Sequence, residues 1–283
     1  MKKYSENVMQ GVFLLSACIS IIAVALICVF LFANGVPAIF KIGITRFLGG
    51  ILWKPSNNLF GILPMIIGSI CVTAGAVIIG VPTGIFTSVY LACFCPERLY
   101  RVIKPAVDLL AGIPSVVYGF FGLMVIVPII RNLFGGSGTS LLAASVVLGI
   151  MILPTIIGVS EAAIRAVPEN YYEGALALGA THERSVFFAV LPAARSGILS
   201  AVILGVGRAI GETMAVIMVA GNQAVMPRGL LKGLRTMTAN IVLEMGYAAD
   251  LHREALIATA VILFIFILVI NLLFMLVKKG KTQ

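Results

Sequence analysis

The chain has 283 residues, of which 60% are hydrophobic and only 11% are charged, and its formal net charge is +9. Soluble domains contain about 25% charged residues, so this composition excludes an ordinary soluble globular protein and predicts a chain whose solvent is membrane lipid. The basic residues are spread along the chain rather than clustered on one face, so we expect no nucleic acid as a partner.

Six runs with little or no charge are long enough to cross a bilayer as helices. We expect spans at about residues 11–33, 60–92, 106–130, 140–160, 195–220 and 255–277. The first run is longer than the apolar region of a signal peptide, and no clear cleavage site follows it, so we expect a retained helix. The sequence therefore predicts one all-α integral membrane domain over residues 1–283.

An even number of spans places both termini on one side of the membrane. Basic residues concentrate on the cytoplasmic side of membrane proteins, and the terminal spans are flanked by lysines, so we expect both termini in the cytoplasm. These lysines are Lys2, Lys3, Lys278, Lys279 and Lys281. The loops at residues 34–59, 131–139 and 221–254 then face outward, and they nevertheless carry eight basic residues. This excess suits an outward face that meets anions, or one that contacts lipid headgroups and a docking partner.

Residue patterns for catalysis or metal binding are absent from the sequence. The tripeptide at residues 280–282 resembles the end of a P-loop, but Met275 stands where that motif requires glycine. Cys93 and Cys95 have neither histidine nor further cysteine nearby, so we expect no metal site. We expect no catalytic residues and no cofactor bound by this chain, which is therefore not expected to be an enzyme.

The third predicted span contains several helix-disrupting residues. Residues 110–123 read Leu-Ala-Gly-Ile-Pro-Ser-Val-Val-Tyr-Gly-Phe-Phe-Gly-Leu. Broken helices of this type recur around transport pathways, and Ser115 and Tyr118 carry hydroxyls that an anion could bind. A kinked packing helix without contact to a substrate is the alternative. Near the cytoplasmic end of this span, Asp108 is expected to pair with Lys104, one helical turn away.

The loop at residues 161–194, here called the docking loop, differs from the other loops. Pro168 and Glu169 favour the start of a short amphipathic helix, Gly179 fits a left-handed helix end, and a second short helix is expected from about Thr181. Apolar side chains on such a loop need a partner, and a groove on another protein could bury them. The alternative is a generic amphipathic segment at the membrane interface.

The fifth predicted span contains two charged residues, Arg208 and Glu212, which are four residues apart and would share one face of a helix. Intramembrane charges usually face a bundle interior or a water-filled cavity. A guanidinium suits the oxygens of phosphate or sulfate, and Glu212 would neutralise Arg208 when no anion is bound. The alternative is a buried ion pair that only orients the bundle.

The docking loop resembles the loop by which permease subunits of ABC importers dock onto a separate ATPase. That family carries Glu-Ala-Ala, then a glycine, then Ile-x-Leu-Pro at fixed spacings. The matching positions here are Glu173, Gly174, Ala175, Gly179, Leu191 and Pro192. Gly174 replaces the first alanine and Ala189 replaces the isoleucine, which are mild departures. The resemblance implies that these residues transmit the motion of the ATPase.

A second resemblance is more specific. Residues 208–216 read Arg-Ala-Ile-Gly-Glu-Thr-Met-Ala-Val, and Gly-Asn follows at residues 221–222. This stretch and residues 110–123 resemble the permeases of phosphate ABC importers of the PstC type, and the resemblance covers roughly residues 60–277. It implies a six-helix bundle of the type I ABC importer (MetI-like) fold, multi-pass in a bacterial or archaeal cell (inner) membrane.

The resemblance also implies partners. These are a homologous PstA-type permease, two PstB-type ATPase subunits that bind ATP and Mg, and an extracytoplasmic PstS-type phosphate-binding protein. The sequence thus favours a permease subunit of an inorganic phosphate importer. Its expected substrate pathway contains Arg208, Glu212, Thr213 and Ser115. Three alternatives are a permease for sulfate or molybdate, an ion-coupled secondary carrier with a proton relay at Arg208 and Glu212, and a membrane sensor or scaffold.

Overall fold

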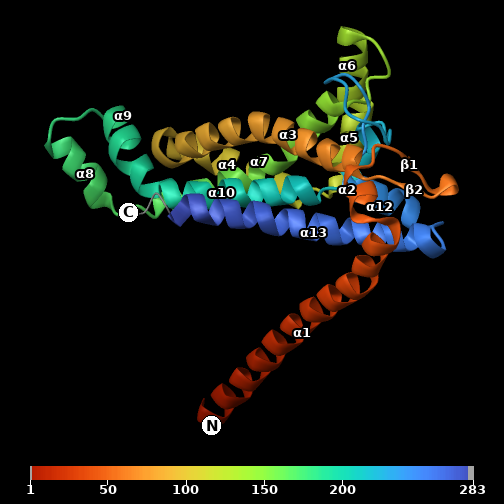
Figure 1. The fold of residues 1–283 in the computed structure, drawn as a ribbon. Coiled ribbons are helices and arrows are strands. Elements are labelled where there is room, and N and C mark those ends of the chain that lie inside the picture. The colour runs from red at the N-terminus through yellow and green to blue at the C-terminus, as the bar shows by residue number, and fades with distance from the viewer. Residues whose placement is uncertain (1, 280–283) are drawn as a thin grey trace.

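The computed structural model describes the backbone of residues 2–279 and the side chains of residues 9–276, so the tripeptide at residues 280–282 and the side chains of the terminal lysines lie outside it. Most of the described chain is helical (Figure 1). The first half contains α1 (Lys2–Ile42), α2 (Ile44–Gly49), β1 (Trp53–Lys54), β2 (Leu59–Phe60), α3 (Leu63–Val89), α4 (Glu97–Gly112), α5 (Ser115–Phe121) and α6 (Val127–Phe134). The second half contains α7 (Leu141–Arg165), α8 (Glu169–Ala177), α9 (His182–Ser185), α10 (Leu191–Gly211), α11 (Met214–Val219), α12 (Met237–Met245) and α13 (Asp250–Lys279).

Six helical segments of the described chain are long and apolar enough to cross a membrane. They are Met9–Ile42, Leu63–Phe94, Ser115–Phe134, Leu141–Arg165, His182–Gly211 and Asp250–Leu276. A single π-helical turn extends α3 to Phe94. Similar turns join α5 to α6 and α9 to α10, so each of these segments continues without interruption. The number of spans agrees with the six predicted from the sequence.

The core of the bundle forms around α7. In its most hydrophobic stretch of 18 residues 61% of the residues are buried, which is the highest share among the six spans. Small residues let α3 and α10 approach it closely, as in other membrane helix interfaces. A Cβ atom added at Gly80 of α3 would lie 2.8 Å from the carbonyl oxygen of Gly149, and one at Gly205 of α10 would lie 2.9 Å from Ile156. Larger side chains at either glycine would therefore push a neighbouring helix away from α7.

In Figure 1, α3, α7, α10 and α13 lie roughly parallel, while α1 leaves the bundle at an angle and contacts α13 only near its own C-terminal end. The ring of Phe32 meets that of Phe264 edge to face at 5.9 Å, and Gly35 packs against Val261. None of the residues in the most hydrophobic stretch of α1 is buried. The bundle has two distinct ends: α8 and α9 form the loop end, and β1, β2 and α12 lie at the hairpin end (Figure 1).

The predicted third span at residues 106–130 does not form one helix. The chain breaks at Ile113 and Pro114, because proline has no N–H to donate and restricts the residue before it to extended backbone. The membrane-spanning segment starts only at Ser115. The residues before the break belong to α4, a separate and strongly amphipathic helix that packs against α7.

The predicted fifth span at residues 195–220 is also interrupted. The spanning helix starts earlier, at His182, and ends at Gly211. Glu212 has extended backbone with ψ near 133°, and α11 begins after Thr213. Hydropathy stays high across this break, which is why the sequence alone predicts a continuous helix.

A buried carboxylate joins α4 to the loop end of α7. Glu161 is 2% exposed, and its Oε1 accepts hydrogen bonds from the hydroxyl of Tyr100 at 2.7 Å and from Nε of Arg165 at 3.0 Å. Its Oε2 lies 3.2 Å from the ammonium of Lys104. Arg165 also stacks on the ring of Tyr100 and donates to the carbonyl of Leu91 at the end of α3. Three helices are therefore tied together through one side chain.

This cluster includes the predicted pair of Lys104 and Asp108, which is confirmed at 3.0 Å. Partial burial opposes the charge on Lys104, but hydrogen bonds to Asp108 and Glu161 outweigh it and raise the pKa of the ammonium. The hydrogen bond that Tyr100 donates to Glu161 raises the pKa of its hydroxyl. The cluster thus holds its charged and protonated groups in place at neutral pH.

We predict that Glu161→Gln lowers the free energy of unfolding by about 1–3 kcal/mol, because it leaves donors of the buried cluster without their charged acceptor. The melting temperature of the purified protein in detergent should fall by several degrees. Glu97→Gln is the matched control, since the ion pair of Glu97 with Arg101 is exposed and contributes little. An equal melting temperature for both variants would show that the cluster does not stabilise the fold.

Candidate functional site

The two interrupted helices pack directly against each other. A Cβ atom added at Gly119 of α5 would lie 2.8 Å from the Cα atom of Ala215 in α11. One turn further on, a Cβ atom at Gly122 would lie 2.8 Å from a methyl group of Val219. Such contacts require glycine, since any side chain would force the helices apart. The two sequence stretches that were singled out separately therefore come together in space.

Arg208 lies on α10, one turn before the break, and is half-buried. Its guanidinium donates one hydrogen bond, 3.1 Å long, to the hydroxyl of Thr155 near the middle of α7. Among the described side chains, no carboxylate lies within 4.0 Å of Arg208, and Thr155 is its only hydrogen-bond partner. A guanidinium has five N–H groups, so most of its donors remain available to an anion.

The expected ion pair between Arg208 and Glu212 is not formed in the structure. The helix ends at Gly211, so a spacing of four residues no longer places the two side chains on one helix face. Oε1 of Glu212 instead accepts the backbone N–H of Ala215 at 3.0 Å, and so caps the start of α11. The backbone carbonyl of Glu212 accepts the hydroxyl of Thr238 at 3.0 Å. Glu212 thus stabilises the break and does not neutralise Arg208.

The break between α4 and α5 is satisfied by a side chain. Pro114 cannot donate to the carbonyl of Leu110 four residues earlier, and the hydroxyl of Tyr118 donates to that carbonyl at 2.8 Å instead. Tyr118 is buried. The proton of the Tyr118 hydroxyl is therefore already used, which leaves Ser115 as the hydroxyl of this motif with a free donor in the described structure.

The other predicted pathway residues lie at the two breaks. Ser115 is the first residue of α5 and half-buried. Thr213 precedes α11, is half-buried, and donates to the carbonyl of Gly211 at 3.3 Å. The arrangement places one guanidinium and several hydroxyls in the part of the bundle where backbone hydrogen bonding is interrupted, which is chemistry suited to an oxyanion.

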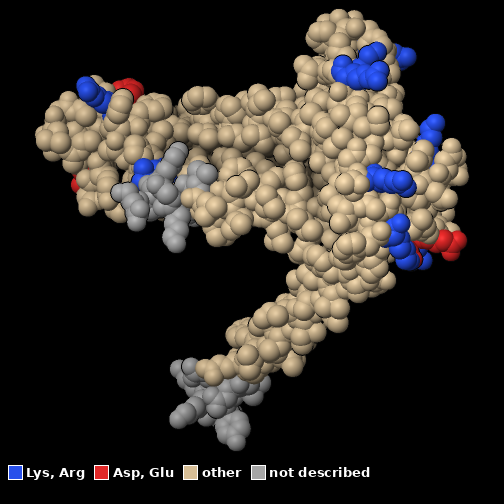
Figure 2. All heavy atoms as spheres, viewed as in Figure 1, with Lys and Arg blue, Asp and Glu red and all other residues tan. Residues whose placement is uncertain are grey.

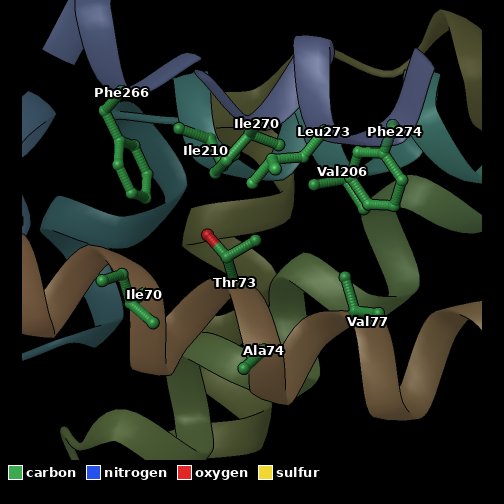
Figure 3. A pocket seen from close by; sticks show the side chains of 10 residues that line it. All are labelled: Ile70, Thr73, Ala74, Val77, Val206, Ile210, Phe266, Ile270, Leu273 and Phe274. Carbon is green, nitrogen blue, oxygen red and sulfur yellow. The ribbon is translucent and has the colours of Figure 1, made fainter. Parts of the chain in front are cut away.

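An apolar hollow of the bundle lies at a different place. A cavity of about 380 Å³ lies between α3, α10 and α13. Figure 3 shows that apolar side chains from all three helices line it and that Thr73 supplies the one hydroxyl among the drawn residues. Such a lining offers no charge to an anion. Within the described side chains, no group of three His, Cys, Asp or Glu residues could hold a metal ion either.

The docking loop has the predicted helix–glycine–helix form. Pro168 precedes α8, and Gly179 has the left-handed backbone (φ +84°) expected of a helix end. The hydroxyl of Thr181 accepts the N–H of Arg184 and caps α9. These three expectations are confirmed.

The residues of the importer motif lie in two places. Glu173, Gly174 and Ala175 are in the middle of α8, where the first two are exposed. Leu191 and Pro192 begin α10, at the junction of loop and span. The apolar side chains of this segment are strongly exposed, with Leu178 at 91% and Phe188 at 78%. Together with Ala175, Gly179, Ala180, Arg184 and Ala189, they line a hollow of about 400 Å³ at the loop end.

His182 holds the docking loop to the bundle, a role that the sequence did not reveal. Its Nε2 lies 3.1 Å from the carbonyl of Cys93 at the end of α3, so this nitrogen carries the proton. Its Nδ1 then accepts the hydroxyl of Tyr172 of α8 at 2.8 Å. The ring also meets that of Phe94 edge to face at 4.8 Å. The sequence does not indicate this role of His182, because its partners Tyr172 and Cys93 lie 10 and 89 residues away in the chain.

Comparison with known proteins identifies the relatives of this chain. The profile of the binding-protein-dependent transport system inner membrane component family matches residues 80–282. A probable ABC transporter permease protein, YqgH of Bacillus subtilis, is 38% identical over 93% of this chain and 90% of its own length. The phosphate transport system permease protein PstC of Mesorhizobium japonicum is 36% identical over 83% of this chain and 78% of its own.

Solved structures share the fold at low identity. The inward-facing MetNI methionine ABC transporter superposes with a TM-score of 0.59 at 21% identity, over 82% of this chain and all of that one. A bacterial ABC transporter for the acidic polysaccharide alginate gives 0.61 at 13% identity, over 94% of this chain and 96% of that one. These likenesses establish the fold class, a MetI-like permease bundle with six membrane-spanning helices.

Glu212 could stabilise this region either by its charge or as the hydrogen-bond acceptor that caps α11, and two substitutions distinguish these roles. We predict that Glu212→Gln retains the protein in the membrane at its normal level, because an amide oxygen can still accept the N–H of Ala215. Glu212→Ala removes the acceptor and should lower the free energy of unfolding by about 0.5–2 kcal/mol. Thermal melting in detergent compares the two. Equal destabilisation by both variants would show that the charge, and not the cap, stabilises this region.

Proposed function

The chain belongs to the binding-protein-dependent transport system inner membrane component family, and on this basis we propose that it imports inorganic phosphate. It is a multi-pass membrane protein and a permease subunit of an ABC importer, and such subunits are non-catalytic because a separate subunit hydrolyses ATP. The phosphate assignment is supported by several relatives named as phosphate transport permeases.

The proposed assembly contains this chain, a homologous PstA-type permease, two PstB-type ATPase subunits and an extracytoplasmic PstS-type phosphate-binding protein. ATP and Mg bind to the ATPase subunits, and this chain binds no cofactor. The loop end and both termini face the cytoplasm of a bacterial or archaeal cell. The two permeases together form the translocation pathway, of which this chain supplies half.

The observation that carries the proposal is the uncompensated guanidinium of Arg208. A charge in the membrane is costly, and an arginine kept there without a carboxylate partner needs another source of negative charge. A passing oxyanion supplies it. The planar fork of the guanidinium matches two oxygens of a tetrahedral oxyanion, and Ser115 and Thr213 at the two breaks offer hydroxyls to the remaining oxygens.

Glu212 favours phosphate over sulfate in this scheme. At neutral pH inorganic phosphate retains at least one proton, whereas sulfate has none. Oε2 of Glu212 has no hydrogen-bond partner among the described residues, so it can accept the proton of a bound phosphate. The same carboxylate repels sulfate, which has no donor to offer, and this combination of attraction and repulsion generates specificity.

Coupling to ATP hydrolysis follows from one continuous helix. The segment His182–Gly211 is 30 residues long, begins in the docking loop and carries Arg208 near its far end. We propose that the ATPase binds the exposed apolar side chains of the docking loop, with Leu178 and Phe188 buried in its surface. Movement of that loop then moves Arg208 relative to Thr155 on α7, and so changes the pathway around the anion.

A permease for another oxyanion, such as sulfate or molybdate, remains the second candidate. Arg208 and the hydroxyls suit any tetrahedral oxyanion, and the name of the Bacillus subtilis relative specifies no substrate. The ion-coupled carrier is no longer favoured, because its proton relay required the pair of Arg208 and Glu212 that the structure lacks.

The test is uptake of labelled phosphate at micromolar concentration by cells whose only copy of this chain is Arg208→Gln. We expect uptake to fall at least about a hundredfold, because a charged partner of the anion is lost. Membrane level and copurification with the ATPase should be unchanged. Arg98→Gln, at an exposed position on α4, is the matched control and should transport normally.

Normal uptake by Arg208→Gln would contradict the proposed anion contact. Competition decides the substrate: a hundredfold excess of sulfate should leave uptake by the unaltered protein unchanged. Strong inhibition by sulfate would favour the broader oxyanion permease.

A further inference from the structure

A hollow lies where the first and last membrane-spanning helices meet the hairpin formed by β1 and β2. Its volume is about 560 Å³, and residues of α1, α2, the hairpin and α13 line it. The polar side chains of the lining are Lys41, Arg46 and Asn58, and every other lining residue is apolar or glycine. Sites for small ligands have volumes of about 300–1,000 Å³ and combine an apolar lining with a few polar groups. The hollow belongs neither to the docking loop nor to the crossing of α5 and α11.

The hollow lies at the level where the spans end. Lys41 is the second-to-last residue of the span Met9–Ile42, and Leu251 is the second residue of the span Asp250–Leu276. On the face of the molecule drawn in Figure 2, lysine and arginine side chains gather toward the two ends of the bundle, and the surface between them shows almost no charge. Phospholipids carry their phosphate groups at this boundary. The hollow is therefore at the depth of lipid headgroups.

The charge around the hollow has an excess of one cation. The ammonium of Lys41 lies 2.7 Å from a carboxylate oxygen of Glu254, which neutralises it. Arg46 is exposed, and among the described side chains it has neither a carboxylate within 4.0 Å nor a hydrogen-bond partner. Asp250 and Arg253, at the start of α13, carry opposite charges. One positive charge thus remains, and the guanidinium that carries it suits the oxygens of a phosphate group.

Apolar side chains beside these cations are exposed although they lie outside the spans. Ile51 is 57% exposed, Leu52 is 52% exposed and Leu59 is 41% exposed. All three line the hollow. A free inorganic anion gains nothing from such side chains, whereas a phospholipid covers them with its glycerol and acyl groups. The same acyl chains can continue along α1, in whose most hydrophobic stretch no residue is buried.

The walls of the hollow are held in place by backbone contacts. The N–H of Ile62 donates to the carbonyl of Phe47 in α2 at 2.9 Å, and Phe47 is fully buried. A Cβ atom added at Gly61 would overlap the backbone of Gly50, so α2 and the end of the hairpin pack as closely as two chain segments can. The segments that carry Arg46 and Asn58 are therefore fixed relative to each other before any ligand binds.

We infer that this hollow binds the headgroup of an anionic phospholipid on the hairpin side of the membrane. The phosphodiester contacts the guanidinium of Arg46 and the amide of Asn58, which has no hydrogen-bond partner among the described residues. The bound lipid joins α1, α2 and α13, and so holds the first span, which otherwise contacts α13 only near its own C-terminal end. A zwitterionic lipid suits the hollow less, because its own cation meets the excess positive charge. The site does not depend on which solute the permease carries.

The test is thermal melting of the complete purified chain in an uncharged detergent, titrated with dioleoylphosphatidylglycerol or dioleoylphosphatidylcholine. Phosphatidylglycerol should raise the melting temperature by several degrees and saturate, whereas phosphatidylcholine should have little effect. Arg46→Gln should raise the half-saturating concentration of phosphatidylglycerol about fivefold, because one contact between a basic residue and the headgroup is lost. Without lipid this variant should melt with the unaltered protein, since Arg46 has no side-chain partner within the described structure.

Arg131→Gln is the matched control. Arg131 is also exposed near the end of a span, Ser115–Phe134, but does not line the hollow, so this variant should bind phosphatidylglycerol like the unaltered protein. An unchanged half-saturating concentration for Arg46→Gln, or an equal change for both variants, would overturn the inference. Equal stabilisation by phosphatidylcholine would do the same. Millimolar inorganic phosphate replaces lipid in a last titration, and a rise in melting temperature that Arg46→Gln abolishes would identify a site for free anions instead.

Discussion

The structure depends on the close packing of α5 against α11, where Gly119 brings its backbone against Ala215. Each of these helices begins at a break, one after Pro114 and one after Glu212. The side chains of Tyr118 and Glu212 each satisfy one backbone group at these breaks: the carbonyl of Leu110 and the N–H of Ala215, respectively. In a membrane, irregular backbone is tolerated only where it is buried in protein or lines a cavity, and we propose that the pathway passes this crossing.

The crossing also explains the charge state of the site. If α10 continued through Glu212, the carboxylate would lie one turn from Arg208 and neutralise it. The break turns Glu212 toward α11 instead and leaves Arg208 with a single neutral partner, Thr155. A cation in this state binds an anion more strongly than a preformed ion pair would, because no carboxylate has to be displaced. The same helix reaches back to the docking loop, so under the proposed function it connects the anion contact at Arg208 with the ATPase.

The sequence predicted the number of spans and the form of the docking loop, because both follow from local signals. Long uncharged runs identify spans, and Pro168, Gly179 and Thr181 punctuate the loop by their backbone preferences. Pro114 and its neighbouring glycines indicated a disrupted third span, but the residue at which that span begins and the break at Glu212 were missed, since hydropathy measures composition and not the path of the chain. The error in the fifth span led directly to the wrong ion pair. The contacts of His182 and Glu161 were beyond reach, because their partners are separated by up to 89 residues.

The most direct test of the central claim is the chemical accessibility of the position beside Arg208. In a variant whose native cysteines are replaced by serine, Thr155→Cys places a thiol next to the guanidinium, and its reaction with small methanethiosulfonate reagents is followed in the assembled transporter. If Arg208 lines an anion pathway, the thiol reacts, an anionic reagent reacts faster than a cationic one of equal size, and phosphate slows the reaction. A thiol that stays unreactive throughout the transport cycle would contradict the account and leave Arg208 as a structural residue of the bundle.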